Sequence, residues 1–186
     1  MKILVTGNPE YGIAKSLNEV LTIDHTLVFL SRKTNDTDLT TDAGIDKLLH
    51  CSTDCDIFIN NSCLINFSQT TVYYKLWNYW KSIKKSGLII NIGSNAEKII
   101  NQSWIYSAEK SALKKASEQG SYKSTWEQSG IKVTYISIGH VNTPFIEKRD
   151  PKFKKHTMNE IANLVKWVIE YPVNTNIHDL TICPIQ

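Results

Sequence analysis

Short runs of apolar residues alternate along the chain with longer segments in which apolar positions recur at helical spacing. The apolar runs predict strands and the periodic segments predict helices. The expected strands are 3–5, 27–30, 57–59, 88–92, 131–136 and 178–183. The expected helices are 12–22, 68–85, 104–128 and 158–170.

Continuous apolar strands that alternate with helices are typical of a parallel sheet covered on both faces. We therefore expect an α/β fold: a Rossmann-like, doubly wound, mostly parallel sheet of about six strands with helices on both faces. The 186 residues fit one domain over 1–186. Ligands of such sheets bind beyond the carboxyl ends of the strands, so candidate residues are sought directly after each apolar run.

Composition narrows the classes of protein and partner. The formal net charge is +3 and the lysines are scattered, so no nucleic-acid partner is expected. No apolar run approaches the roughly 20 residues of a membrane helix, and the apolar start is too short for a signal peptide, so we expect a cytoplasmic protein without membrane contact. The four cysteines lack the spacing of a zinc site, so no metal is expected.

Tyr106 and Lys110 lie four residues apart in segment 104–128, which places both side chains on one helix face. A nearby ammonium lowers the pKa of a tyrosine, so the pair could exchange a proton with a carbonyl or an alcohol. Ser94 follows strand 88–92, where its hydroxyl could bind a substrate oxygen. A serine after a strand can equally be a turn residue or a helix cap.

The context of these residues resembles the catalytic stretch of short-chain dehydrogenases/reductases, with 89–94 followed by 106–113. Three further segments resemble the family's N-terminal glycine motif, its Asn-Asn-Ala-Gly segment and its Pro-Gly-x-x-x-Thr segment: Thr6-Gly7 with Gly12-Ile13-Ala14, Asn60-Asn61-Ser62, and Gly139-His140-Val141-Asn142-Thr143. The order of the five segments identifies the chain as a member of this family over about residues 1–145.

The resemblance implies an oxidoreductase that moves a hydride between a nicotinamide cofactor and a small carbonyl or alcohol. Tyr106 would be the general acid/base, Lys110 would hold the nicotinamide ribose, and Ser94 would hold the substrate oxygen. Asn66 lies at the family's offset before Ser94 and would be the fourth catalytic residue, which holds a water. The residues expected to bind the cofactor are Thr6, Gly7, Gly12, Ile13, Ser31, Arg32, Asp38, Leu39, Asn60, Asn61, Tyr106, Lys110, Gly139, Val141 and Thr143.

NADP is the expected cofactor, with NAD the alternative. Arg32 follows strand 27–30, and a guanidinium suits a 2′-phosphate, whereas an acid at this place would favour NAD. Arg32 could also be an ordinary exposed cation. Asp38 resembles the acid with which the family contacts adenine.

Several departures from the family leave an alternative open. One extra residue separates Gly7 from Gly12, Ala14 stands where a third glycine is usual, and the chain is too short for two of the family's helices. A non-catalytic dinucleotide-binding or scaffold protein with this fold is therefore the alternative to an enzyme.

Segment 68–85 carries aromatic residues over more of its circumference than one core-facing stripe requires. We expect a homodimer or homotetramer that associates through helices 68–85 and 104–128. The alternatives are that helix 68–85 is simply more buried, or that the chain is an aromatic-rich interaction module for nucleic acid or protein.

Overall fold

The computed structural model of the protein describes residues 1–63, 66–98, 103–144, 153–172 and 174–185. Within these residues, none of the helices combines the length and apolar character needed to cross a membrane.

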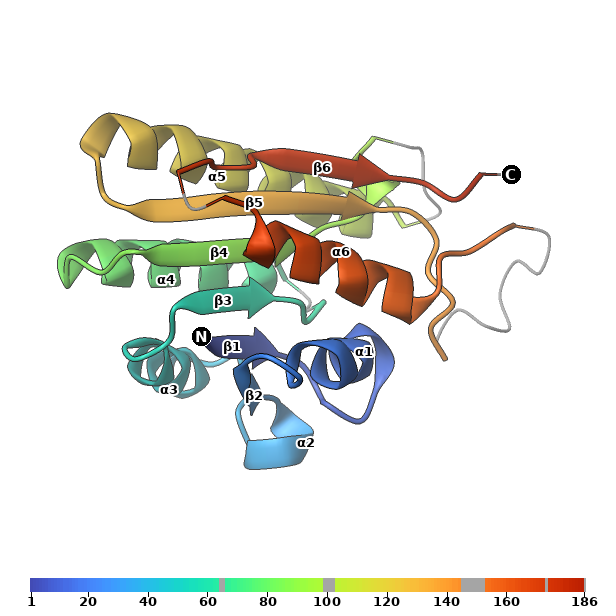
Figure 1. Cartoon of the computed structure of the whole chain (residues 1–186), viewed down its shortest axis with the longest axis horizontal. Coiled ribbons are helices and arrows are strands. Elements are labelled where there is room, and N and C mark those ends of the chain that lie inside the picture. Colours follow the sequence, from blue (N-terminus) through green and yellow to red (C-terminus); the bar gives the residue numbers. More distant parts are fainter. Residues whose placement is uncertain (64–65, 99–102, 145–152, 173, 186) are drawn as a thin grey trace.

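Six strands of the described chain form one sheet in the order β2-β1-β3-β4-β5-β6, and every neighbouring pair is parallel (Figure 1). The strands are β1 (Lys2–Thr6), β2 (Thr26–Leu30), β3 (Ile57–Asn60), β4 (Gly87–Ile92), β5 (Ile131–Ile138) and β6 (Asp179–Ile182). The chain runs outward from β1 to β2 and then returns to place β3 on the other side of β1. This reversal creates a topological switch point between β1 and β3, where such folds bind ligands.

Helices cover both faces of the sheet (Figure 1). On one face lie α1 (Gly12–Leu21) and α6 (Met158–Glu170), and on the other lie α3 (Asp42–Ser52), α4 (Ser68–Ser82) and α5 (Trp104–Glu127). A short helix, α2 (Arg32–Asn35), follows β2, and a 3-10 turn, η1 (Asn95–Glu97), follows β4.

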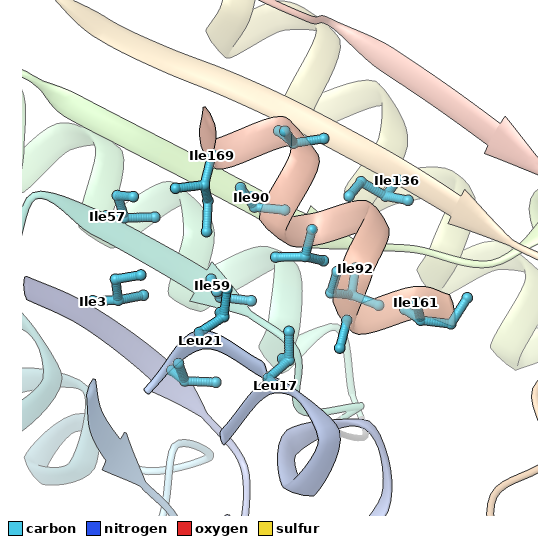
Figure 2. Close-up of a cluster of buried hydrophobic side chains, with 14 of the residues drawn as sticks. Ile3, Leu17, Leu21, Ile57, Ile59, Ile90, Ile92, Ile136, Ile161 and Ile169 are labelled. Carbon is cyan, nitrogen blue, oxygen red and sulfur yellow. The ribbon is translucent and has the colours of Figure 1, made fainter. Parts of the chain in front are cut away.

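Alternate side chains of each central strand enter two separate cores. In β1, Ile3 and Val5 pack in the core under α1 and α6, whereas Leu4 packs in the core under α3, α4 and α5. Figure 2 shows the first core, where isoleucines of the strands meet leucines of α1 and isoleucines of α6. Burial on both faces explains why the central strands are continuous apolar runs.

The predicted fold class is confirmed, and each predicted strand and helix is present within a few residues of its expected ends. Two helices, α2 and α3, were not expected. The hydroxyl of Thr41 accepts from the Gly44 N–H at 3.1 Å and caps α3, while Ile45 and Leu48 face the core. A helix cap followed by apolar residues at spacing 3 was therefore the signal for α3.

Candidate active site

Ser94, Tyr106 and Lys110 converge beyond the carboxyl end of β4. Ser94 is the second residue after this strand, and the other two lie in the first turns of α5. The Ser94 side chain lies close enough to the Tyr106 hydroxyl to favour its ionised form. Lys110 Nζ lies 5.6 Å from the centroid of the Tyr106 ring. The structure thus brings together the three residues that the sequence singled out for proton transfer.

The start of α5 fixes where Tyr106 lies. Ser103 precedes the helix in an extended conformation, and its hydroxyl accepts from the Tyr106 N–H at 3.3 Å. This cap places Tyr106 in the first helical turn and Lys110 one turn later on the same face. The Lys110 side chain is 4% exposed, whereas Tyr106 is half-buried.

Burial dominates the electrostatics of the pair. Burial raises the pKa of Tyr106, and the effect of the nearby Ser94 side chain offsets only part of that rise. Burial also lowers the pKa of Lys110, against the opposing charges of Cys63 and Glu109. The direction for Tyr106 is opposite to the one expected from its spacing to Lys110, because desolvation of the phenolate outweighs the favourable contacts.

The Lys110 ammonium is held by a residue that sequence reasoning missed. Lys110 Nζ donates to Gln69 Oε1 at 2.7 Å and, more weakly, to the main-chain oxygen of Ile92 at 3.4 Å. Asn66, the expected fourth catalytic residue, is exposed and lies before α4 with a left-handed φ of 57°. The signal for Gln69 was a polar residue on the stripe that buries Val72, Leu76 and other apolar residues of α4.

Tyr135 of β5 contacts the main chain of Ser94. The Ser94 N–H donates to the Tyr135 hydroxyl at 3.4 Å, and this hydroxyl donates in turn to the Glu97 carboxylate. The Glu97 side chain is 2% exposed and also accepts from Ser137 at 3.1 Å and from Lys114 at 3.1 Å. This buried carboxylate therefore joins η1, β5 and α5 beneath the serine.

The ends of β1 and β3 are locked together at the switch point. The Thr6 hydroxyl accepts from the main-chain N–H groups of Asn61 at 2.9 Å and Ser62 at 3.0 Å. Asn61 Nδ2 donates to the Thr6 carbonyl at 3.1 Å. Gly7 has a φ of 136°, and a Cβ there would lie 2.9 Å from both the Ala14 Cβ and Asn61 Nδ2. A glycine is therefore required beside this junction.

The N-terminus of α1 faces open space. An added Cβ at Gly12 would meet no atom within 4 Å, and its φ is 60°. Tyr11 stands at the N-cap without a side-chain hydrogen bond, and the first turn contains no acid. Ile13 packs against the first core and anchors the helix. The first-turn N–H groups, with the positive end of the helix dipole, are suited to an anion.

The segment after β2 presents two exposed cations, Arg32 and Lys33. Ser31 caps α2 by accepting from the Thr34 N–H at 3.1 Å. The Arg32 side chain is 71% exposed and lies 3.8 Å from the Asp38 carboxylate. Asp38 also accepts from the Thr40 N–H at 2.9 Å, and its hydrogen bonds to Thr40 lower its pKa. Leu39 is buried in the second core, so its side chain packs inside rather than on this surface.

Segment 139–143 lies beside the end of β6. The Gly139 N–H donates to the Ile182 carbonyl at 2.9 Å. Val141 is buried and pairs with His156 in an isolated bridge, and the Thr143 N–H donates to the Val141 carbonyl at 2.8 Å. Thr143 is half-buried next to this turn.

Known proteins are similar to this chain in sequence and in fold. Residues 36–154 match the family model described as short chain dehydrogenase. An uncharacterized oxidoreductase of Staphylococcus haemolyticus is 26% identical over 93% of this chain and 80% of its own length. Another, from Staphylococcus epidermidis, is 30% identical over 71% of this chain and 55% of its own length.

Solved structures show the same fold at lower identity. A short chain dehydrogenase from Burkholderia cenocepacia, in complex with NADP, superposes with a TM-score of 0.80 at 16% identity, over 98% of this chain and 88% of that one. The 3-alpha-hydroxysteroid dehydrogenase of a Pseudomonas species, complexed with NADH, has a TM-score of 0.76 at 16% identity, over 98% and 95%. Because the family model spans more than half of the sequence, the chain belongs to the short-chain dehydrogenase family of oxidoreductases.

Proposed function

We propose that the protein is an NADP-dependent oxidoreductase that reduces a small carbonyl compound, or oxidises the corresponding alcohol, with Tyr106 as general acid/base. The observation that carries this proposal is the convergence of Ser94, Tyr106 and Lys110 beyond β4, with the Lys110 ammonium 5.6 Å from the centroid of the Tyr106 ring. The bound cofactor would supply or accept the hydride.

Each side chain of the site has its own role in the proposed reaction. The Ser94 hydroxyl orients the substrate oxygen, and the Tyr106 hydroxyl gives it a proton during reduction. Because burial raises the pKa of Tyr106, the phenol stays protonated at neutral pH, which favours reduction there and leaves oxidation to alkaline solution. The Lys110 ammonium would hold the ribose of the nicotinamide cofactor.

Asn66 remains a proposed holder of water in proton transfer. Its exposed position leaves the amide open to solvent. The neighbouring Phe67 N–H donates to the Glu109 carboxylate at 3.0 Å, which holds this segment beside the turn of α5 that carries Lys110.

The residues along the strand ends fit a dinucleotide. The open N-terminus of α1, where a Cβ added at Gly12 would meet no atom within 4 Å, would take the pyrophosphate. Asn61 with segment 139–143 would line the nicotinamide half, and Asn60, whose side chain is buried, would support this edge from within the fold. Of the two similar solved structures, one is a complex with NADP and the other a complex with NADH. Our preference for NADP therefore rests on Ser31 and on the exposed guanidinium of Arg32, which would lie beside the adenosine ribose.

The test is Tyr106→Phe, assayed by NADPH oxidation with a panel of small aldehydes and ketones. Loss of the proton donor should lower turnover by about 10²–10⁴-fold. Thermal shift should still detect binding, with a larger shift for NADPH than for NADH. Tyr171→Phe, at the end of α6, keeps its ring on Trp167 and serves as control. Full activity of Tyr106→Phe would refute the mechanism, and no shift with either cofactor would favour a non-catalytic scaffold.

We also propose that the protein forms a homodimer or homotetramer through helices α4 and α5. Large apolar side chains stand exposed on these helices, among them Tyr74, Trp104, Tyr122 and Trp126. Exposed large apolar side chains on two neighbouring helices are typical of an association surface.

A further inference from the structure

Gln69 lies in the first turn of α4, and its side chain is 5% exposed. Its amide nitrogen donates to the main-chain oxygens of Asn60 at 2.9 Å and Ile92 at 3.1 Å. Both amide hydrogens therefore face carbonyls at the ends of β3 and β4. This leaves the amide oxygen to face α5, where it accepts from Lys110 Nζ at 2.7 Å.

A second layer of buried amides fixes this orientation. Asn60 Nδ2 donates to the main-chain oxygen of Gln69 at 3.1 Å and to Asn91 Oδ1 at 2.8 Å. Asn91 Nδ2 donates to the Ser117 hydroxyl of α5 at 2.9 Å. Rotation of the Gln69 amide would break hydrogen bonds that water cannot replace in the interior, so the oxygen stays directed at Lys110.

Burial disfavours the charge of Lys110, and its titratable neighbours offset this only in part. Burial lowers its pKa, and the titratable groups that act on it are Cys63 after β3 and Glu109 of α5, with the Tyr106 ring beside it. A neutral amide supplies a hydrogen bond to the ammonium without cancelling its charge, as a carboxylate would. The charge thus remains available to a ligand at the strand ends.

We propose that Gln69 is the positioning residue of Lys110: its amide oxygen fixes where the ammonium lies beside Tyr106 and leaves that charge free to act on the cofactor. The second half of this inference rests on the proposed function, whereas the first half does not.

The first half is tested without cofactor or substrate, by following the Lys110 side-chain signal in ¹³C-lysine-labelled protein against pH. The signal is assigned by its loss in Lys110→Met. Gln69→Glu should raise the titration midpoint of Lys110 by about one to three pH units, because an opposite charge replaces a dipole. Gln119→Glu makes the same charge change on an exposed position of α5 and should leave the midpoint unchanged.

Gln69→Met removes the hydrogen bond without burying a new charge, so it covers the case in which Gln69→Glu does not fold. It should lower the Lys110 midpoint. An unchanged midpoint in either Gln69 variant that folds would overturn the contact on which the proposal stands.

The second half is tested by a double-mutant cycle on the dissociation constant of NADPH at pH 7. Gln69→Met should weaken binding about tenfold in the native chain and have no further effect in a Lys110→Met background. Equal weakening in both backgrounds would show that Gln69 acts through general structure and would overturn its positioning role. Failure of the native chain to bind NADPH or NADH would count against the proposed function, and the Lys110 titration would then decide the role of Gln69 by itself.

Discussion

The ammonium group of Lys110 is buried, and burial of this charge lowers the free energy of unfolding. Burial places its folded pKa below the ordinary value of 10.5. At any pH below the folded pKa, the lysine is charged in both states and the full penalty is present. As pH rises through the folded pKa toward 10.5, the folded form loses its charge first and the penalty disappears.

Lys110→Met should therefore stabilise the protein at neutral pH while removing its activity. A gain of about 1 kcal/mol would raise the melting temperature by about 2–4 °C in a chain of this size. Calorimetry from pH 6 to 10 should show the gain shrinking as pH rises. Lys115→Met, at an exposed lysine of α5, is the matched control. A variant less stable than the native chain at pH 7 would mean that the buried ammonium stabilises the fold.

The sequence could predict the site residues whose positions are set by a single strand or helix. Ser94 stands at a strand end, and the spacing of Tyr106 and Lys110 fixes their common face within one helix. Gln69 could not be assigned in this way, because its contact depends on how α4 packs against α5. Asn66 was placed by a family offset, and in this shorter chain that position lies before the helix.

At the scale of elements, the apolar runs predicted the sheet because burial on both faces leaves no polar side chain in β3 before Asn60 or in β4 before Asn91. Helix α3 was missed because its core contacts come from few residues, chiefly Ile45 and Leu48, and its first turn reads as polar loop. Strand order could not be read from periodicity, since every central strand has the same pattern.

The close approach of Gly93, directly after β4, to Tyr135 of β5 gives a prediction at this scale. A Cβ at Gly93 would lie 2.1 Å from Cζ of Tyr135, which is fully buried and cannot move away. Gly93→Ala should lower the free energy of unfolding by about 1–3 kcal/mol, measured by urea denaturation.

Tyr135→Val shortens the opposing side chain, so the double variant should lose less stability than the two single losses added together. Additive losses, or a harmless Gly93→Ala, would show that the ring does not require a glycine above it.

At the scale of the whole molecule, the aromatic residues of α4 divide between core and surface. Tyr73, Trp77 and Trp80 are buried in the second core. Many of the aromatic residues that exceed one core-facing stripe of segment 68–85 therefore pack inside the protein. The most exposed large apolar side chains of this face lie on α5, with Trp126 at 85% and Trp104 at 77%. The sequence could not divide these aromatic residues between core and surface, because periodicity alone does not distinguish a deeply buried helix from one with two apolar faces.

The association prediction is that Trp126→Lys weakens self-association at least about tenfold, as expected for a central tryptophan of an interface. Sedimentation velocity over a range of protein concentrations measures the change. Ile23→Lys alters another exposed apolar residue, which lies after α1, and should leave the assembly unchanged. A monomeric native chain, or equal effects of both substitutions, would argue against an interface on α5.

The most direct test of the central claim follows the hydride itself. The protein is incubated with NADPH that carries deuterium at the transferable position and with a panel of small carbonyl compounds, and the alcohol products are examined by mass spectrometry. We predict one deuterium on the carbinol carbon of at least one product, made by the native chain and not by Tyr106→Phe. Products without deuterium, or equal transfer by both proteins, would contradict hydride transfer assisted by Tyr106.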